Sequence, residues 1–217
     1  MLYVSCQPNQ NELYYTRDFI LNMAYAAELG GAQGLRIEGI KNINFVKKRC
    51  SLPLIGLIKI KIPNKERYIT PSLKEVDKLI KTDCDLIAID YTLRDGMDEN
   101  FYFKISDHLR KISKKKIVAD ISTIEEAKMA SKLEVDYIAT TLRGYTKKTK
   151  QIEVPDIDFI KELKDSGINN IIAEGGYSNH SQFKKAVENG AIIVTVGTAI
   201  TRPHLIVKKI LTGEYNP

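Results

Sequence analysis

The chain has 217 residues, of which 43% are hydrophobic and 28% are charged, so its length and composition suit a globular protein with a large core. No apolar run approaches the roughly 18 residues that a membrane-spanning helix needs, which argues against a membrane protein. We therefore predict a single domain over residues 1–217.

The net charge of +6 is compatible with an anionic partner such as nucleic acid, a membrane surface or a phosphorylated metabolite. Many lysines, however, fall in amphipathic stretches such as KKAVENG, where a solvated helix face explains them. No stripe of aromatic residues alternates with arginines as in single-stranded nucleic-acid platforms. We therefore expect no nucleic-acid partner and no membrane partner.

The three cysteines, Cys6, Cys50 and Cys84, are scattered without CxxC spacing, which predicts free thiols rather than disulfides or a zinc site. The three histidines are also far apart and lack ligand spacing, so we expect no metal site. The amino-terminal stretch has neither a basic segment nor a long apolar one, which predicts a cytoplasmic protein without a secretory signal or lipid anchor.

Short apolar runs alternate with longer amphipathic runs along the whole chain. This alternation is typical of β/α units around a parallel sheet. We predict eight strands, at 2–6, 33–37, 52–59, 86–90, 116–121, 137–141, 170–175 and 191–197. The helix-like stretches between them include 18–31, 72–81, 123–135 and 180–190.

Eight units of this size predict a closed (β/α)8 TIM barrel, an α/β fold with one domain. The competing arrangement is an open doubly wound sheet, which normally carries a glycine-rich turn after its first strand. Here LYVSC is followed by QPNQNE, so that turn is missing and the barrel is favoured.

Polar and ionisable residues stand at the carboxyl ends of the predicted strands, where the chemistry of a barrel takes place. A carboxylate such as Glu174, directly after IIA, is costly to bury unless it is paired or used. Any one of these residues could simply begin a polar loop, and Asp90 in IDYT could cap or turn the chain locally through its side chain. Together, however, they predict one charged mouth. In strand order they are Gln7, Arg36, Lys59, Asp90, Asp120, Thr141 and Glu174.

Two of these residues show a more specific local pattern. Lys59 follows the apolar stretch LPLIGLI, and partial desolvation would lower its pKa and free the amine as a base or Schiff-base nucleophile. Lys61 would lower it further if it also faced the mouth, although Lys59 could instead snorkel or pair with a carboxylate. Asp120 precedes Ser122 and Thr123, either of which could cap the next helix and leave the aspartate for another role.

Glycines follow the last two predicted strands, with Gly175 and Gly176 after the seventh and Gly197, before Thr198, after the eighth. Barrels bind phosphate with backbone N–H groups of these two loops. We predict that these four residues form a phosphate site to which Arg202 adds a charge-assisted contact. Glycine also serves any tight turn, so a structural explanation stays open.

Eight stretches are the most distinctive part of the sequence. They are VSCQ at 4–7, GGAQGLRI at 30–37, LPLIGLIK at 52–59, YITPSLKEVDKLI at 68–80, ADISTIEEA at 119–127, TTLRGYT at 140–146, AEG at 173–175 and VGTAITRP at 196–203. In this order the chain resembles the N-acylglucosamine-6-phosphate 2-epimerase family, which interconverts the 6-phosphates of N-acetylmannosamine and N-acetylglucosamine in sialic acid and amino sugar breakdown.

The resemblance implies an isomerase without a cofactor, acting on a phosphorylated N-acyl amino sugar, with Lys59 as the catalytic lysine and Glu174 as its carboxylate companion. The C2 hydrogen of the open-chain sugar lies beside the C1 aldehyde, so its removal leaves an enolate whose oxyanion Arg36 could stabilise. One-base and two-base routes both stay open. The resemblance also implies a set of substrate-binding residues, namely Gln7, Arg36, Asp120 and Arg202.

Two positions depart from the family pattern. Family members commonly continue the catalytic lysine with Arg-Asp-Tyr, where this chain has Ile60, Lys61 and Ile62. They also often carry a basic residue at the position of Gly176. The first departure affects loop contacts, and the second removes a contact to phosphate or to a loop.

Three other functions stay open on the sequence alone. They are an aldolase or synthase that forms a Schiff base at Lys59, a non-catalytic phosphosugar-binding barrel, and a basic nucleic-acid binder. The segment 147–151 is interpreted as the solvated part of a long loop or lid over the barrel. Barrels of this kind often pair through helices outside the mouth, so we expect a homodimer.

Overall fold

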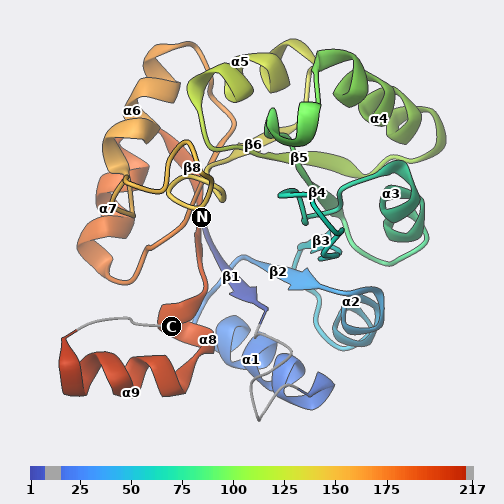
Figure 1. Cartoon of the computed structure of the whole chain (residues 1–217). Helices are drawn as coiled ribbons and strands as arrows, with labels where there is room; N and C mark the ends of the chain where they lie inside the picture. Colours follow the sequence, from blue (N-terminus) through green and yellow to red (C-terminus); the bar gives the residue numbers. More distant parts are fainter. Residues whose placement is uncertain (8–15, 214–217) are drawn as a thin grey trace.

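The computed structural model describes residues 1–7 and 16–213, in which eight parallel strands close into one barrel (Figure 1). Each strand pairs with the next along the chain, and β8 pairs with β1. The predicted (β/α)8 fold and its eight strands are confirmed, although several strands are shorter than expected. They are β1 (Leu2–Cys6), β2 (Gly34–Glu38), β3 (Leu54–Leu57), β4 (Leu86–Asp90), β5 (Lys116–Asp120), β6 (Tyr137–Ala139), β7 (Ile171–Glu174) and β8 (Ala191–Val196).

Helices surround the barrel as an outer layer (Figure 1). Within the described ranges, none of them has the length and apolar character that crossing a bilayer requires. Thr123 caps one of them through a capping box with Glu126, as the sequence suggested for the helix after Asp120. They are α1 (Arg17–Leu29), α2 (Ile40–Lys47), α3 (Leu73–Ile80), α4 (Glu99–Ile112), α5 (Ile124–Lys132), α6 (Ile157–Asp165), α7 (His180–Glu188), α8 (Thr198–Thr201) and α9 (Pro203–Thr212), with a 3₁₀ turn at Arg94–Gly96.

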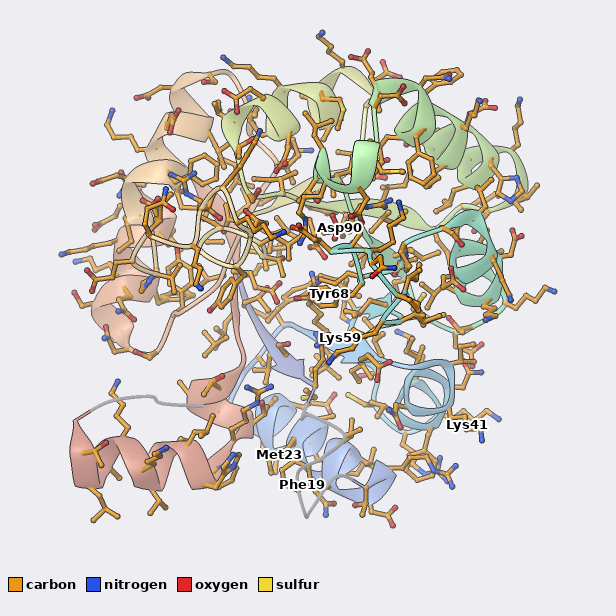
Figure 2. All side chains as sticks on the ribbon, viewed as in Figure 1. Phe19, Met23, Lys41, Lys59, Tyr68 and Asp90 are labelled. Atoms are coloured by element: carbon orange, nitrogen blue, oxygen red, sulfur yellow. The ribbon has the colours of Figure 1, made fainter. Side chains whose placement is uncertain are left out.

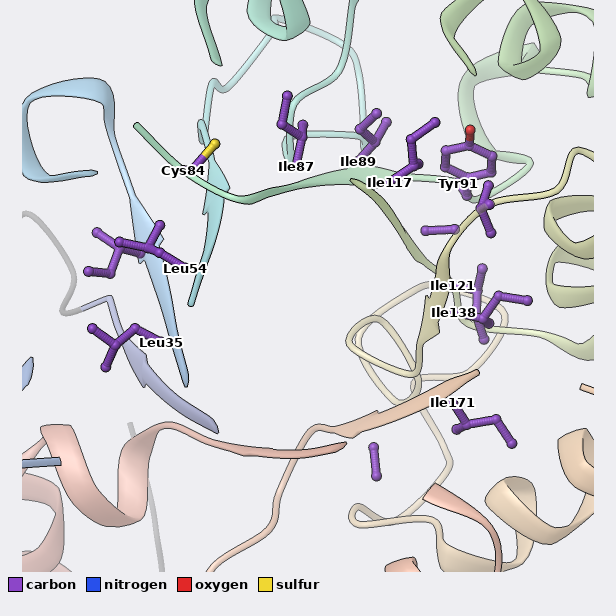
Figure 3. Close-up of a cluster of buried hydrophobic side chains, with 14 of the residues drawn as sticks. Leu35, Leu54, Cys84, Ile87, Ile89, Tyr91, Ile117, Ile121, Ile138 and Ile171 are labelled. Atoms are coloured by element: carbon purple, nitrogen blue, oxygen red, sulfur yellow. The ribbon is translucent and has the colours of Figure 1, made fainter. Parts of the chain in front are cut away.

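An apolar layer fills the space between the strands and the helices. Strand side chains such as Leu35, Ile87, Ile117 and Ile171 are buried in it and point away from the barrel axis (Figure 3). Because successive side chains of a strand alternate between its two faces, the residues between them point into the barrel.

These inward positions form a second apolar cluster that includes Ile55, Leu57, Ala88, Val118 and Ile172. The apolar filling stops towards the carboxyl ends of the strands. Two residues further along their strands, the inward positions become polar, and they are Lys59, Asp90, Asp120, Glu174 and Thr195. The period of two along each strand therefore assembles the charged groups in one layer above the packed core.

The opposite end of the barrel is filled by the ring of Tyr3, which packs over Gly34 on the neighbouring strand. A Cβ atom on residue 34 would lie 2.2 Å from Tyr3 Cζ, a distance that no packing tolerates. Gly34 is therefore required by a close approach rather than by its own backbone conformation.

We expect Gly34→Ala to destabilise the protein by about 1–3 kcal/mol, because the added methyl group overpacks the barrel against Tyr3. A loss of this size lowers Tm by a few degrees and is measurable by thermal unfolding. Gly30→Ala is a matched control, since a Cβ there keeps 3.3 Å from its nearest neighbour. Equal Tm values for the two variants would contradict the packing argument.

Candidate active site

A cavity of about 550 Å³ opens at the carboxyl ends of the strands. Asp90 and Asp120 are fully buried and do not belong to its wall, so the prediction that all the strand-end groups converge on the mouth is wrong for these two. The predicted residues that do line it are Gln7, Arg36, Lys59, Thr141, Glu174, Gly175, Gly176, Gly197, Thr198 and Arg202.

A more open hollow of about 640 Å³ lies at the other end of the barrel, around Tyr3, Leu86 and Tyr137. Two of its lysines have partners: the Lys115 ammonium donates to the Thr82 carbonyl oxygen at 2.7 Å, and the Lys116 ammonium lies over the Tyr137 ring. The strand-end charges lie at the opposite face, so the 550 Å³ cavity is the candidate active site.

Arg36 is the centre of a buried charge cluster. Its guanidinium donates to both carboxylate oxygens of Asp120, at 3.0 and 2.6 Å, and its Nη1 lies 3.2 Å from Glu174 Oε2. The Thr141 hydroxyl also donates to Asp120, at 2.8 Å. Asp120 therefore acts on the cavity through Arg36, which it holds in one orientation by a bidentate pair.

Glu174 is fixed at the end of β7 by the side chain of Thr140, which follows the neighbouring strand β6. The Glu174 N–H donates to Thr140 Oγ1 at 3.0 Å, and the Thr140 hydroxyl is placed 2.9 Å from the Glu174 carbonyl oxygen. The buried oxygen Oε2 has no hydrogen-bond partner among the described residues, although Arg36 is close. This arrangement leaves a rigidly mounted carboxylate with an unused acceptor at the cavity.

Burial above all, and also the charge of Asp120, raise the pKa of Glu174, while Arg36 and Lys59 oppose the rise, and the resulting pKa is about 7. A carboxyl group that titrates near neutral pH can both take up and release a proton during a reaction.

Lys59 lies just beyond β3, where its backbone pairs with Ile69 and its N–H donates to Glu38 Oε1 at 3.4 Å. The side chain is exposed to the cavity, but the surrounding wall displaces much of its water. This desolvation lowers the pKa of Lys59, and the positive charges of Arg36 and Arg202 lower it further. The direction agrees with the sequence analysis.

Lys61 was expected to contribute to this shift if it faced the mouth. It is exposed and does not belong to the cavity wall, since the chain leaves the barrel after Lys59 and turns back at the tip of a loop. The cations beside Lys59 come instead from β2 and from the end of α8.

Gly175 and Gly176 have φ values of 112° and 79°, which favour glycine. A Cβ atom on residue 176 would lie 2.7 to 2.8 Å from backbone atoms of Val154 and Pro155. The loop after β6 therefore leaves no room for the basic side chain that the family often carries there. Gly197 instead has φ −110°, and its backbone packs beside Ser5.

The cavity residues that the sequence did not single out include Tyr68, Tyr145, Tyr177 and Thr195. The Tyr177 hydroxyl and Thr195 Oγ1 are buried and find no hydrogen-bond partner in the described part of the chain. Thr195 could have been found from the alternation of β8, since it lies two residues after the inward-facing Ile193. The tyrosines lie on loops, where no such period applies.

The closed barrel, with a lysine and a carboxylate of altered pKa at the carboxyl face of its strands, defines a TIM-barrel enzyme that uses acid–base chemistry. The chain belongs to the family described as "Putative N-acetylmannosamine-6-phosphate epimerase", whose match covers residues 20–213. The resemblance seen in the sequence is thereby confirmed.

Relatives and a solved structure agree with this assignment. The "Putative N-acetylmannosamine-6-phosphate 2-epimerase" of Mycoplasmopsis pulmonis is 42% identical over 220 residues, covering 96% of this chain and 94% of the relative. The protein of the same name from Caldanaerobacter subterraneus is 42% identical over 215 residues, covering 97% and 90%. The solved N-acetylmannosamine-6-phosphate 2-epimerase from Clostridium perfringens superposes with a TM-score of 0.92 at 38% identity, covering 98% of this chain and 93% of that chain.

We expect the free energy of unfolding of Glu174→Gln, relative to wild type, to be higher at about pH 8 than at about pH 5, by up to about 3 kcal/mol. The pKa of Glu174 is about 7 in the folded state and 4.5 in the reference state, so the folded state binds more protons between these values. The free energy of unfolding therefore falls as pH rises through this window, and the neutral amide removes that loss.

Thermal unfolding of both proteins at the two pH values checks this expectation. The control is Glu188→Gln, which neutralises a carboxylate on the exposed face of α7 beside Lys184. A Tm difference between wild type and Glu174→Gln that is the same at both pH values would contradict the prediction.

Proposed function

We propose that this protein interconverts N-acetylmannosamine 6-phosphate and N-acetylglucosamine 6-phosphate by removing and returning the proton at C2. The observation that carries the proposal is the presence of Lys59 and Glu174 in one cavity, with pKa values displaced towards neutrality from opposite directions. The family and the names of the relatives support the identity of the substrate.

Inversion at C2 requires the proton to leave one face of the carbon and return to the other. Lys59 follows β3 and Glu174 ends β7, and these strands lie on opposite sides of an eight-stranded barrel. A sugar bound between them presents one face to each group. This placement favours a two-base route, in which one group removes the proton and the other supplies one.

The intermediate between these two steps is an enolate with negative charge on the C1 oxygen. Arg36 lines the same cavity, and Asp120 holds its guanidinium in one orientation. A fixed positive group beside the developing charge lowers the barrier because it needs no reorganisation during the reaction. We assign Arg36 this role, with Asp120 as its positioning residue.

The 6-phosphate is assigned to the loops after β7 and β8. Gly175, Gly176, Gly197 and Thr198 bring backbone atoms to the cavity wall, and Arg202 adds a positive charge beside them. Such loops are the usual phosphate site of a barrel. This assignment leaves the part of the cavity around Arg36, Lys59 and Glu174 for the C1–C2 end of the sugar, and Gln7 for a polar contact nearby.

We further propose that the enzyme works in the cytoplasm as a homodimer of single-domain subunits and without a cofactor. The chemistry supports the last point, because the acidity of the C2 hydrogen comes from the adjacent aldehyde of the substrate itself.

We expect wild-type protein in D₂O to convert N-acetylmannosamine 6-phosphate into the gluco epimer with deuterium at C2. Lys59→Ala should lower the rate by about 100-fold or more, since general acid–base catalysis contributes at least this much. Proton NMR follows both epimers and the C2 signal directly. The matched control is Lys61→Ala, a lysine outside the cavity wall, which should keep its activity.

An unchanged spectrum from folded wild-type protein would overturn the epimerase proposal. The aldolase alternative would then be tested by borohydride reduction with substrate, because a Schiff base at Lys59 is trapped by reduction and a proton-transferring lysine is not.

We expect kcat/KM to show a bell-shaped pH dependence, with an acid limb near pH 7 from Glu174 and an alkaline limb below 10.5 from Lys59. Activity needs one group protonated and the other deprotonated, and either assignment gives the same two limbs. Initial rates across this range check the expectation. A profile that stays flat from about pH 5 to about pH 8 would exclude Glu174 as an essential group.

A further inference from the structure

The segment after β3 is a short hairpin that brings a tyrosine back to the cavity. Lys59 pairs with Ile69 in antiparallel fashion, and the Ile60 N–H donates to the Tyr68 carbonyl oxygen at 2.9 Å. Lys59 and Tyr68 therefore lie on the two arms of one hairpin, and both side chains line the cavity. Figure 2 shows them, with Asp90, near the centre of the barrel.

A buried arginine anchors this hairpin to β4. Arg67 is 3% exposed, donates through Nη2 to the Asp90 carbonyl oxygen at 3.1 Å, and places Nε 3.7 Å from the Asp90 carboxylate. Its guanidinium lies over the rings of Phe101 and Tyr102, at 5.0 and 5.4 Å from their centroids. The Asp90 N–H also donates to Ile69, at 3.1 Å.

The tip of the hairpin is held by a second set of charged contacts. Arg94 donates to the Asp90 carboxylate at 2.6 Å and to the Glu66 carbonyl oxygen at 3.2 Å. The Asp95 carboxylate accepts the N–H groups of Glu66 and Arg67, each at 3.0 Å. Asp90 thus serves this anchor rather than the mouth, and the return arm of the hairpin is fixed from Glu66 to Ile69.

The Tyr68 side chain lies between this anchor and the catalytic cluster. Burial raises the pKa of Tyr68, Asp120 and Asp90 raise it further, and Arg94 and Arg36 oppose the rise. The phenol therefore stays protonated at neutral pH. It can donate a hydrogen bond, and it cannot serve as a base.

We propose that Tyr68 is a substrate-contacting residue, whose hydroxyl donates a hydrogen bond to an oxygen at the C1–C2 end of the bound sugar phosphate, and that Arg67 positions it. The inference rests on the proposed function, which places this end of the sugar beside Lys59 and Arg36. The rigid hairpin sets the tyrosine in advance of binding, so little ordering is required when the substrate arrives.

Tyr68→Phe removes only the hydroxyl and should lower kcat/KM about tenfold or more while leaving Tm unchanged. Tyr137→Phe is the matched control, a partly buried tyrosine at the start of β6 with Lys116 over its ring, at the other end of the barrel. It should keep wild-type kcat/KM. A folded Tyr68→Phe protein with wild-type kcat/KM overturns the proposal.

Calorimetric titration with N-acetylmannosamine 6-phosphate separates the two proposals. Wild type that binds this compound without epimerising it refutes the proposed function, and weaker binding by Tyr68→Phe would still support the contact. Equal binding by the two proteins refutes the contact. Wild type that neither binds nor epimerises the compound refutes both.

Arg67→Met tests the positioning role through coupling. If Arg67 acts through Tyr68, the double variant Arg67→Met/Tyr68→Phe should have nearly the same kcat/KM as Arg67→Met alone. Arg67→Lys should restore part of the activity, because its ammonium can donate to Asp90. Fully additive losses overturn this role. If Arg67→Met does not fold, Asp95→Ala takes its place in the double-mutant cycle with Tyr68→Phe, because it removes the carboxylate that accepts the Glu66 and Arg67 N–H groups.

Discussion

The Arg36–Asp120 pair is the interaction on which the site depends. Both side chains are essentially removed from water, so each charge is stable only because the other satisfies it with two hydrogen bonds. One arginine serves two carboxylates unequally: Asp120 takes the bidentate contact, and Glu174 keeps an oxygen without a hydrogen bond. Asp120 thus holds the arginine in place, while Glu174, whose pKa is raised mainly by burial, can titrate near neutral pH.

Much of this arrangement could be predicted from the sequence. The apolar runs located all eight strands, and the strand ends identified Arg36, Lys59 and Glu174, because the period of two along a strand decides which side chains face the barrel. Asp90 was misplaced because its partners lie in loops. Arg94 follows Asp90 by four residues in the next loop, whereas Arg67 approaches it through a hairpin that no period in the sequence announces.

Roles that depend on distance between segments were also beyond the sequence. Gly176 had been interpreted as a phosphate contact or a turn, but its neighbours come from Val154 and Pro155 on another loop. Tyr68 belongs to a motif that was quoted for its resemblance, yet its place at the cavity follows from the return arm of the hairpin. The period of two along the strands therefore predicted which charged groups lie at the strand ends. The packing of the loops decides which of these groups reach the cavity.

The packing of the Tyr3 ring over Gly34 affects how substrate and product enter and leave the cavity. That ring and the apolar layer above it fill the barrel beneath the cavity, which opens at the carboxyl ends of the strands. Reactant and product are epimers of the same size and charge, and each must use this opening and occupy the same groups. The two sugars therefore compete for the same cavity, and their concentrations in solution set the direction of the net reaction.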